Sequence, residues 1–288
     1  MTMELSECFN RLKKLLSKNY DDGFSQALFD AIKAARSVLD ESTLIDLPTK
    51  VPEKRYIAFQ ASSKMSRAIN VDLYDADGYL EALEKLMRGE TDGLSVGAIN
   101  SCVYTSTIIF CAANDLLKKS DQKTPGTFFE YLCAAILKNT LGVVPSKSLA
   151  VMNLDRNEKL PTDLIFDMGH EKPKFHVPVK TSTRERIIQV WAHQRVIDGA
   201  YGTGRFLGCP IILGENKKDS KTREVVEICL PSQWRLYQMH VAQLWRIAYL
   251  DIPSAYERLS KVFPPVPVTT LGDLLADGGE LRKIALGH

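Results

Sequence analysis

The 288-residue sequence lacks several features that would place it outside the ordinary globular proteins. Its six cysteines form no Cys-x-x-Cys pair and no cluster with histidine, which argues against a disulfide framework and against a structural zinc site. Aromatic residues make up only 8% of the chain, and a net charge of +2 is too small to indicate a nucleic-acid partner by itself. We therefore expect reduced, mostly buried thiols and a partner that charge alone does not identify.

Long hydrophobic runs are also missing. The most apolar stretch, residues 103–113, is interrupted by threonine and serine and is too short to span a bilayer. Residues 1–16 include acidic side chains and have the spacing of an amphipathic helix. A signal peptide has instead a basic start and an unbroken apolar centre. We therefore expect a cytoplasmic protein with no membrane partner.

The chain divides by pattern into two parts. Residues 1–120 have mostly helical spacing of apolar residues, with an irregular or short-stranded stretch at 40–70. Residues 121–288 alternate helices, expected at 128–139, 182–198 and 232–248, with short β-runs at 164–167, 175–179, 210–213 and 225–230. This predicts an α/β fold, with a mixed central β-sheet flanked by helices behind an α-helical N-terminal region.

An acid and a lysine are expected to meet at the mouth of a β-hairpin. The runs at 160–167 and 175–180 are joined by a glycine-containing turn, so that Asp163 opens the first strand and Lys180 ends the second. Phosphodiester hydrolysis needs carboxylate oxygens for Mg²⁺ and a cation to orient the attacking water. Asp163 and Lys180 supply part of that set, with Asp167 as a rival for the carboxylate.

This hairpin resembles the PD-(D/E)xK nuclease signature. Pro161-Thr162-Asp163 stands in place of Pro-Asp, and Pro178-Val179-Lys180 in place of Glu-x-Lys. The usual carboxylate two residues before the lysine is absent, because Pro178 cannot bind a metal. The resemblance spans about residues 124–200 and implies a restriction-endonuclease-like core.

The residues after Lys180 point to one subgroup of these nucleases. Lys180 is followed after three residues by Arg184-Glu185-Arg186 at the start of an expected helix. This string is similar to the recognition element of the type II restriction endonucleases that read CCGG or CC…GG. An arginine fork can pair with guanine O6 and N7 while a glutamate accepts from cytosine N4, so the resemblance assigns these three residues, with Gln189, to DNA binding.

The same subgroup takes a second carboxylate from an upstream helix, and the resemblance places Glu130 in that role beside Asp163 as a Mg²⁺ ligand. The subgroup usually carries a third acid on the helix after the lysine, where this chain has His193. His193 shares a helical face with Arg186 and is assigned to the catalytic site with Asp163, Lys180 and Glu130.

Structural roles compete with each of these assignments. Ser182 and Glu185 fit a capping box, in which Glu185 would bond to the backbone and would not read a base. Glu130 fits a surface acid near a helix N-terminus, and His193 fits a partly buried packing residue. The glycines of residues 199–204 follow a helix and lack a Lys-Ser/Thr ending, so nucleotide binding is not expected.

The resemblance implies a homodimeric, Mg²⁺-dependent type II restriction endonuclease that cuts double-stranded DNA at a C/G-containing palindromic site. Two alternatives stay open. One is a methylation-dependent or repair-type DNA nuclease on the same scaffold. The other is a non-catalytic DNA-binding protein whose nuclease site has decayed, which the absent acids at Pro178 and His193 keep open.

Overall fold

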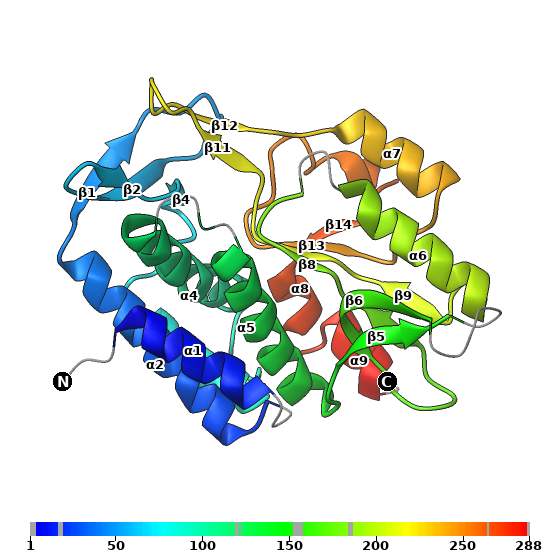
Figure 1. Ribbon diagram of the computed structural model, residues 1–288. Coiled ribbons are helices and arrows are strands. Elements are labelled where there is room, and N and C mark those ends of the chain that lie inside the picture. The colour runs from blue at the N-terminus through cyan, green and yellow to red at the C-terminus, as the bar shows by residue number, and fades with distance from the viewer. Residues whose placement is uncertain are drawn as a thin grey trace.

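Helices enclose a mixed β-sheet on both of its faces (Figure 1). The structure is a computed structural model, and it describes residues 4–16, 20–118, 121, 123–151, 158–183, 187–263 and 265–286. Within these residues the predicted α/β class is confirmed, as is the helical N-terminal region.

The N-terminal part combines four helices with a small antiparallel sheet. The helices are α1 (Leu5–Leu15), α2 (Asp22–Asp40), α3 (Tyr79–Met87) and α4 (Val96–Leu117). The sheet fills the stretch where short strands were expected, with β1 (Thr43–Leu47), β2 (Tyr56–Ala61), β3 (Lys64–Met65) and β4 (Ile69–Asn70). Side-chain caps fix the starts of α2 and α4, because Asp21 accepts a hydrogen bond from the Phe24 amide and Ser95 accepts one from the Ala98 amide.

Helix α4 is long and apolar enough to cross a membrane by length and composition. In the fold, however, 78% of its apolar window is buried against other parts of the chain. Residues along its whole length join the main hydrophobic core, with side chains that come from as early as Leu5 and as late as Ala285. The helix therefore serves as the central core helix.

Two four-stranded sheets meet end to end at a pair of prolines. One has the order β5 (Ser146–Ala150), β6 (Lys159–Phe166), β7 (Lys174–His176) and β9 (Phe206–Gly208). The other, all parallel, has the order β14 (Val268–Thr270), β13 (Ile247–Tyr249), β10 (Ile211–Ile212) and β8 (Val179–Lys180).

Backbone hydrogen bonds cross the junction without a shift of register. His176 pairs with Gly208 before the break and Val179 with Ile211 after it. The amides of Cys209 and Ile211 donate to the carbonyls of His176 and Pro178, both at 2.8 Å. Pro178 and Pro210 have no N–H to donate, so the strands are interrupted there while the ladder continues. The two sheets together form the mixed central sheet.

Alternate residues of the central strands contact different helix layers. Ala248 packs in the main core with α4, α5 (Lys123–Leu141), α8 (Leu271–Leu275) and α9 (Glu280–Leu286). Ile247 and Tyr249 pack on the opposite face in a second cluster with α6 (Ile188–Tyr201) and α7 (Pro231–His240). Figure 1 shows α6 and α7 together on that side of the strands. The remaining elements are the hairpin β11 (Asn216–Lys218) and β12 (Val225–Glu227), and a 3₁₀ turn at Leu259–Lys261.

The predicted helix at 232–248 is wrong in its second half. Helix α7 ends at His240, and Ile247–Tyr249 forms strand β13 between β10 and β14. A short apolar run fits a doubly buried strand as well as a buried helix, and here the parallel neighbours on both sides decide the outcome.

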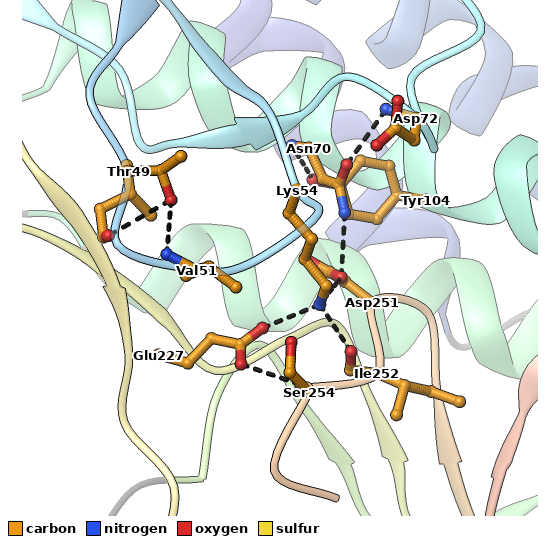
Figure 2. A network of polar contacts seen from close by, with 11 residues as sticks. Thr49, Val51, Lys54, Asn70, Asp72, Tyr104, Glu227, Asp251, Ile252 and Ser254 are labelled. Atoms are coloured by element: carbon orange, nitrogen blue, oxygen red, sulfur yellow. Dashed lines mark hydrogen bonds and ion pairs between the residues drawn. The ribbon is translucent and has the colours of Figure 1, made fainter. Parts of the chain in front are cut away.

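A buried ionic network joins the N-terminal sheet to the end of the central sheet (Figure 2). The Lys54 ammonium donates to Glu227 and Asp251, both at 2.8 Å, and to the Ile252 carbonyl at 2.6 Å. Asn70 donates to the same Asp251 carboxylate at 3.1 Å. The three acceptors around the Lys54 ammonium and the two donors to the Asp251 carboxylate compensate for the lost hydration of these charges. The division into residues 1–120 and 121–288 stays a prediction, and contacts of this kind link the two parts.

Candidate functional site

Asp163 and Lys180 lie side by side. Asp163 is on β6 and Lys180 ends β8, and the Lys180 ammonium is 2.6 Å from a carboxylate oxygen of Asp163. The same oxygen accepts the Val179 amide at 2.8 Å, which fixes the carboxylate against the edge of the neighbouring strand. The two side chains are 24% and 38% exposed, so both are open to a ligand.

The predicted hairpin differs from the observed one in two respects. Asp163 lies inside β6 and does not open it, because pairing with β5 extends that strand back to Lys159. Lys180 belongs to β8 and not to the strand that pairs with β6, because Pro178 interrupts the run after His176. The two functional groups still meet, since the strand continues past the proline in unchanged register.

Two cavities adjoin this pair, and both are lined by Asp163, Lys180, Gln189 and Val190. The smaller, of about 140 Å³, also has Pro161, Thr162, His176, Pro178 and His193 in its wall. The larger, of about 270 Å³, also has Lys123, Gly126, Thr127, Glu130, Val179, Thr181, Ser182, Thr183 and Ile187. The acid–lysine pair therefore faces His193 on one side and Glu130 on the other.

Glu130 reaches the larger cavity from helix α5. Its carboxylate accepts a hydrogen bond from Lys147 of β5, and its side chain is only 20% exposed. Burial raises the pKa of Glu130, while the Lys147 and Lys180 ammonium groups oppose that rise and the charge of Asp163 adds to it. Lys147 is a charged neighbour that the sequence analysis does not identify, since β5 carries no clear strand pattern.

His193 and His176 both lie in the wall of the smaller cavity, with ring centroids 6.4 Å apart. His176 is fully buried, and its Nδ1 is 3.0 Å from the side-chain oxygen of Gln194. The Gln194 amide nitrogen donates to Asp198 and to the Phe206 carbonyl, so its oxygen is the acceptor and His176 Nδ1 carries the proton. No motif in the sequence marks His176, which lies in strand β7, as part of the site.

Burial favours the neutral form of both histidines. It lowers the pKa of His176 to about 4, with the Gln194 contact opposing the change and His193 adding to it. Burial also lowers the pKa of His193, and the nearby Lys180 charge lowers it further. Gly208 makes room for this cluster, because a Cβ there would lie 2.5 Å from the Gln194 oxygen.

Asp167, the rival carboxylate, lies past the end of β6 and lines neither cavity. Its side chain pairs with Lys174 and accepts a hydrogen bond from the Gly169 amide at 3.1 Å, as a turn residue does.

Arg184, Glu185 and Arg186 lie outside the described residues, so the recognition assignment and the capping-box alternative both stay predictions. Gln189 is exposed and borders both cavities.

The chemistry of the donor set fits Mg²⁺. Mg²⁺ prefers oxygen ligands and is usually held by one or two carboxylates together with substrate phosphates. Asp163 and Glu130 line one cavity and offer such carboxylates, while the described residues contain no group of three or more His, Cys, Asp or Glu side chains placed to hold a metal. Water molecules and a substrate phosphate would complete the coordination.

Comparison with solved structures identifies the fold. The crystal structure of the type IIP restriction endonuclease Kpn2I is 27% identical in sequence, with 97% of each chain covered and a TM-score of 0.83. A complex of the restriction endonuclease PspGI with substrate DNA is a more distant likeness, at 13% identity, with 73% of this chain and 89% of that chain covered and a TM-score of 0.47. No family model and no curated protein matches the chain.

Proposed function

We propose that the protein is a type II endonuclease that hydrolyses phosphodiesters of double-stranded DNA with Mg²⁺. The chain has the restriction-endonuclease fold over nearly its whole length. The observation that carries the proposal is the Asp163–Lys180 pair, 2.6 Å apart, in the wall of a cavity that Glu130 also lines. An acid, a lysine and a second acid around a cavity open to solvent are the groups that metal-assisted phosphate hydrolysis requires.

Each side chain has a role that its placement supports. Asp163 and Glu130 would hold the Mg²⁺, which supplies Lewis-acid stabilisation of the charge that grows on the phosphate. The Lys180 ammonium would orient the attacking water and offset charge on the phosphate oxygens. His193, whose pKa is lowered by burial and by the Lys180 charge, would accept a hydrogen bond from that water; a packing role is the alternative.

DNA recognition is assigned to Arg184, Glu185 and Arg186, with Gln189 beside them. The support is their position in the chain, between the cavity residue Thr183 and the helix that carries Gln189 into the walls of both cavities. A palindromic duplex presents each half-site to one subunit of a two-fold assembly, so we propose a homodimer in which each subunit cuts one strand.

The alternative of a non-catalytic DNA-binding protein rests on Pro178 and His193, which stand where the resembled nucleases have acids. A methylation-dependent nuclease is the second alternative, and it shares the same catalytic groups. Incubation of unmodified and cytosine-methylated copies of one long mixed-sequence duplex with Mg²⁺ separates them. We expect discrete fragments from the unmodified copy, whereas cutting of the methylated copy alone supports the second alternative.

Lys180→Ala is the matched control for that assay. Because Lys180 is partly exposed at a strand end, the variant should fold and bind DNA but not cut it. Intact DNA with both proteins, together with sequence-specific binding by both, would favour the non-catalytic alternative.

A further inference from the structure

His176 has one ring nitrogen without a partner beside the acid–lysine pair. The side chain is fully buried on β7, and its Nδ1–H is donated to the Gln194 oxygen at 3.0 Å. The other ring nitrogen, Nε2, therefore carries the lone pair. Nε2 is buried and has no hydrogen-bond partner among the residues that the structure describes. A buried acceptor of this kind indicates a partner from solvent or ligand, because burial without a hydrogen bond is costly.

The unpartnered nitrogen belongs to the smaller cavity. His176 lines this cavity together with Asp163 and Lys180. Gln194 does not line it, so the part of the His176 ring that borders the cavity is the edge opposite Nδ1, which includes Nε2. Thr162 also lines the cavity, and its hydroxyl oxygen is buried without a partner in the described part of the chain. The cavity thus offers an acceptor and a hydroxyl in the same wall as the acid–lysine pair.

The His176 ring is oriented from the side away from the cavity. The Gln194 amide nitrogen donates to Asp198 and to the Phe206 carbonyl, both at 2.9 Å, so this amide cannot turn over without losing both contacts. Gly208 leaves room for the arrangement, because a Cβ there would lie 2.5 Å from the Gln194 oxygen. These contacts fix which ring nitrogen carries the proton, as a third group does behind a histidine that acts on a reactant.

The size and chemistry of the cavity suit water. Its volume of about 140 Å³ has room for a few molecules, since each occupies roughly 30 Å³ in the liquid. A buried water makes about three hydrogen bonds, and the wall supplies an acceptor, a hydroxyl and a cationic donor from His176, Thr162 and Lys180. A metal ion fits less well, because the described residues hold no group of three or more His, Cys, Asp or Glu side chains placed for one.

We infer that His176 Nε2 accepts a hydrogen bond from the water that attacks the phosphate and, together with Lys180, sets the position of that water. The inference deepens the proposed function and rests on it. The Lys180 ammonium has three hydrogens, and the one donated to Asp163 leaves others for the water oxygen. The water then gives one hydrogen to His176 and keeps its second lone pair for the phosphorus atom. A reactant held in this way reacts faster because its orientation is already set.

Two substitutions of His176 separate this role from packing. In His176→Asn, the amide nitrogen takes the place of Nδ1 and keeps the contact with Gln194, but no atom takes the place of Nε2. In His176→Gln, the carbonyl oxygen takes the place of Nε2 and keeps an acceptor at the cavity, but the contact with Gln194 is lost. A purely structural His176 makes the asparagine variant the more active of the two. A water-binding His176 predicts the opposite order.

The single-turnover cleavage rate in Mg²⁺ and the affinity for the cleaved duplex in Ca²⁺ are measured for the wild type and both variants, with the melting temperature as a check of folding. His176→Asn should slow cleavage by about 10- to 100-fold, the scale of a displaced reactant, and should leave the affinity unchanged. His176→Gln should cut several-fold faster than His176→Asn. A rate for His176→Asn equal to that of the wild type, or not below that of His176→Gln, would overturn the inference.

A second measurement needs no DNA. In protein labelled with ¹⁵N-histidine, His176 is the imidazole whose Nδ1–H is protected from exchange with solvent, as its burial requires. We expect its Nε2 to have the chemical shift of a hydrogen-bonded acceptor and its ring protons to show a nuclear Overhauser contact with water. A His176 ring without that contact would overturn the inference, even if neither variant folds. A wild-type protein that cuts no DNA would instead refute the proposed function, and the spectrum would still report whether His176 binds water.

Discussion

Acid should destabilise this protein through His176, and His176→Asn should remove that effect. Burial lowers the pKa of His176 to about 4, while an unfolded chain has an ordinary histidine pKa of about 6.5. Between those values the unfolded chain binds more protons than the folded one, so stability is complete above about pH 6.5 and is lost as the pH falls towards 4. Each unit between the two pKa values is about 1.4 kcal/mol, so the complete loss is about 3.5 kcal/mol.

The asparagine variant isolates this contribution, because its side chain does not titrate and can still donate to the Gln194 oxygen. Urea unfolding of both proteins at about pH 7.5 and pH 4.5 gives four free energies of unfolding. The wild type should lose about 2.5 kcal/mol more than the variant between the two conditions. Equal losses, within about 0.5 kcal/mol, would mean that His176 is not buried in its neutral form.

Three further predictions concern the site. Asp163→Ala should abolish cleavage, whereas Asp167→Ala should cut at the wild-type rate because Asp167 lines neither cavity. Cleavage rates of both variants in one plasmid assay test this assignment, and the reverse result would show that the wrong carboxylate is assigned. Glu130→Gln should reduce Mg²⁺-dependent cleavage by orders of magnitude and leave metal-free DNA binding unchanged, so wild-type activity at the same Mg²⁺ concentration would exclude Glu130 as a ligand. Arg186→Ala should cost about 1–3 kcal/mol for the specific site and much less for random duplex, and an unchanged ratio would argue against base reading.

Local chemistry made much of the fold predictable from the sequence. The helix caps and the apolar residues that define the N-terminal helices lie close together in the sequence, and so do the paired strands β6 and β7. Strand β13 was not predictable in this way, because Ile247–Tyr249 is a strand only between two parallel neighbours that are distant in sequence. The same applies to β5, whose pairing moves the start of β6 back from Asp163.

The residues of the candidate site were more predictable from the sequence than the side chains that contact them. A resemblance in sequence drew attention to Asp163, Lys180 and Glu130, and the structure places these three around one cavity. The contacts that tune them come from elsewhere in the fold. Lys147 contacts Glu130 from β5, and Glu215 contacts Thr183 from beyond β10, and neither pairing has a signature in sequence spacing.

The most direct test of the central claim is to sequence the fragment ends after wild-type protein acts on a long, unmodified, mixed-sequence duplex in Mg²⁺. The proposed endonuclease predicts that every end falls within one short C/G-containing palindrome, with one cut in each strand, and that Asp163→Ala yields no ends above background. Ends scattered without a common sequence, or intact DNA from a protein confirmed to be folded, would contradict a site-specific nuclease built on the Asp163–Lys180 pair.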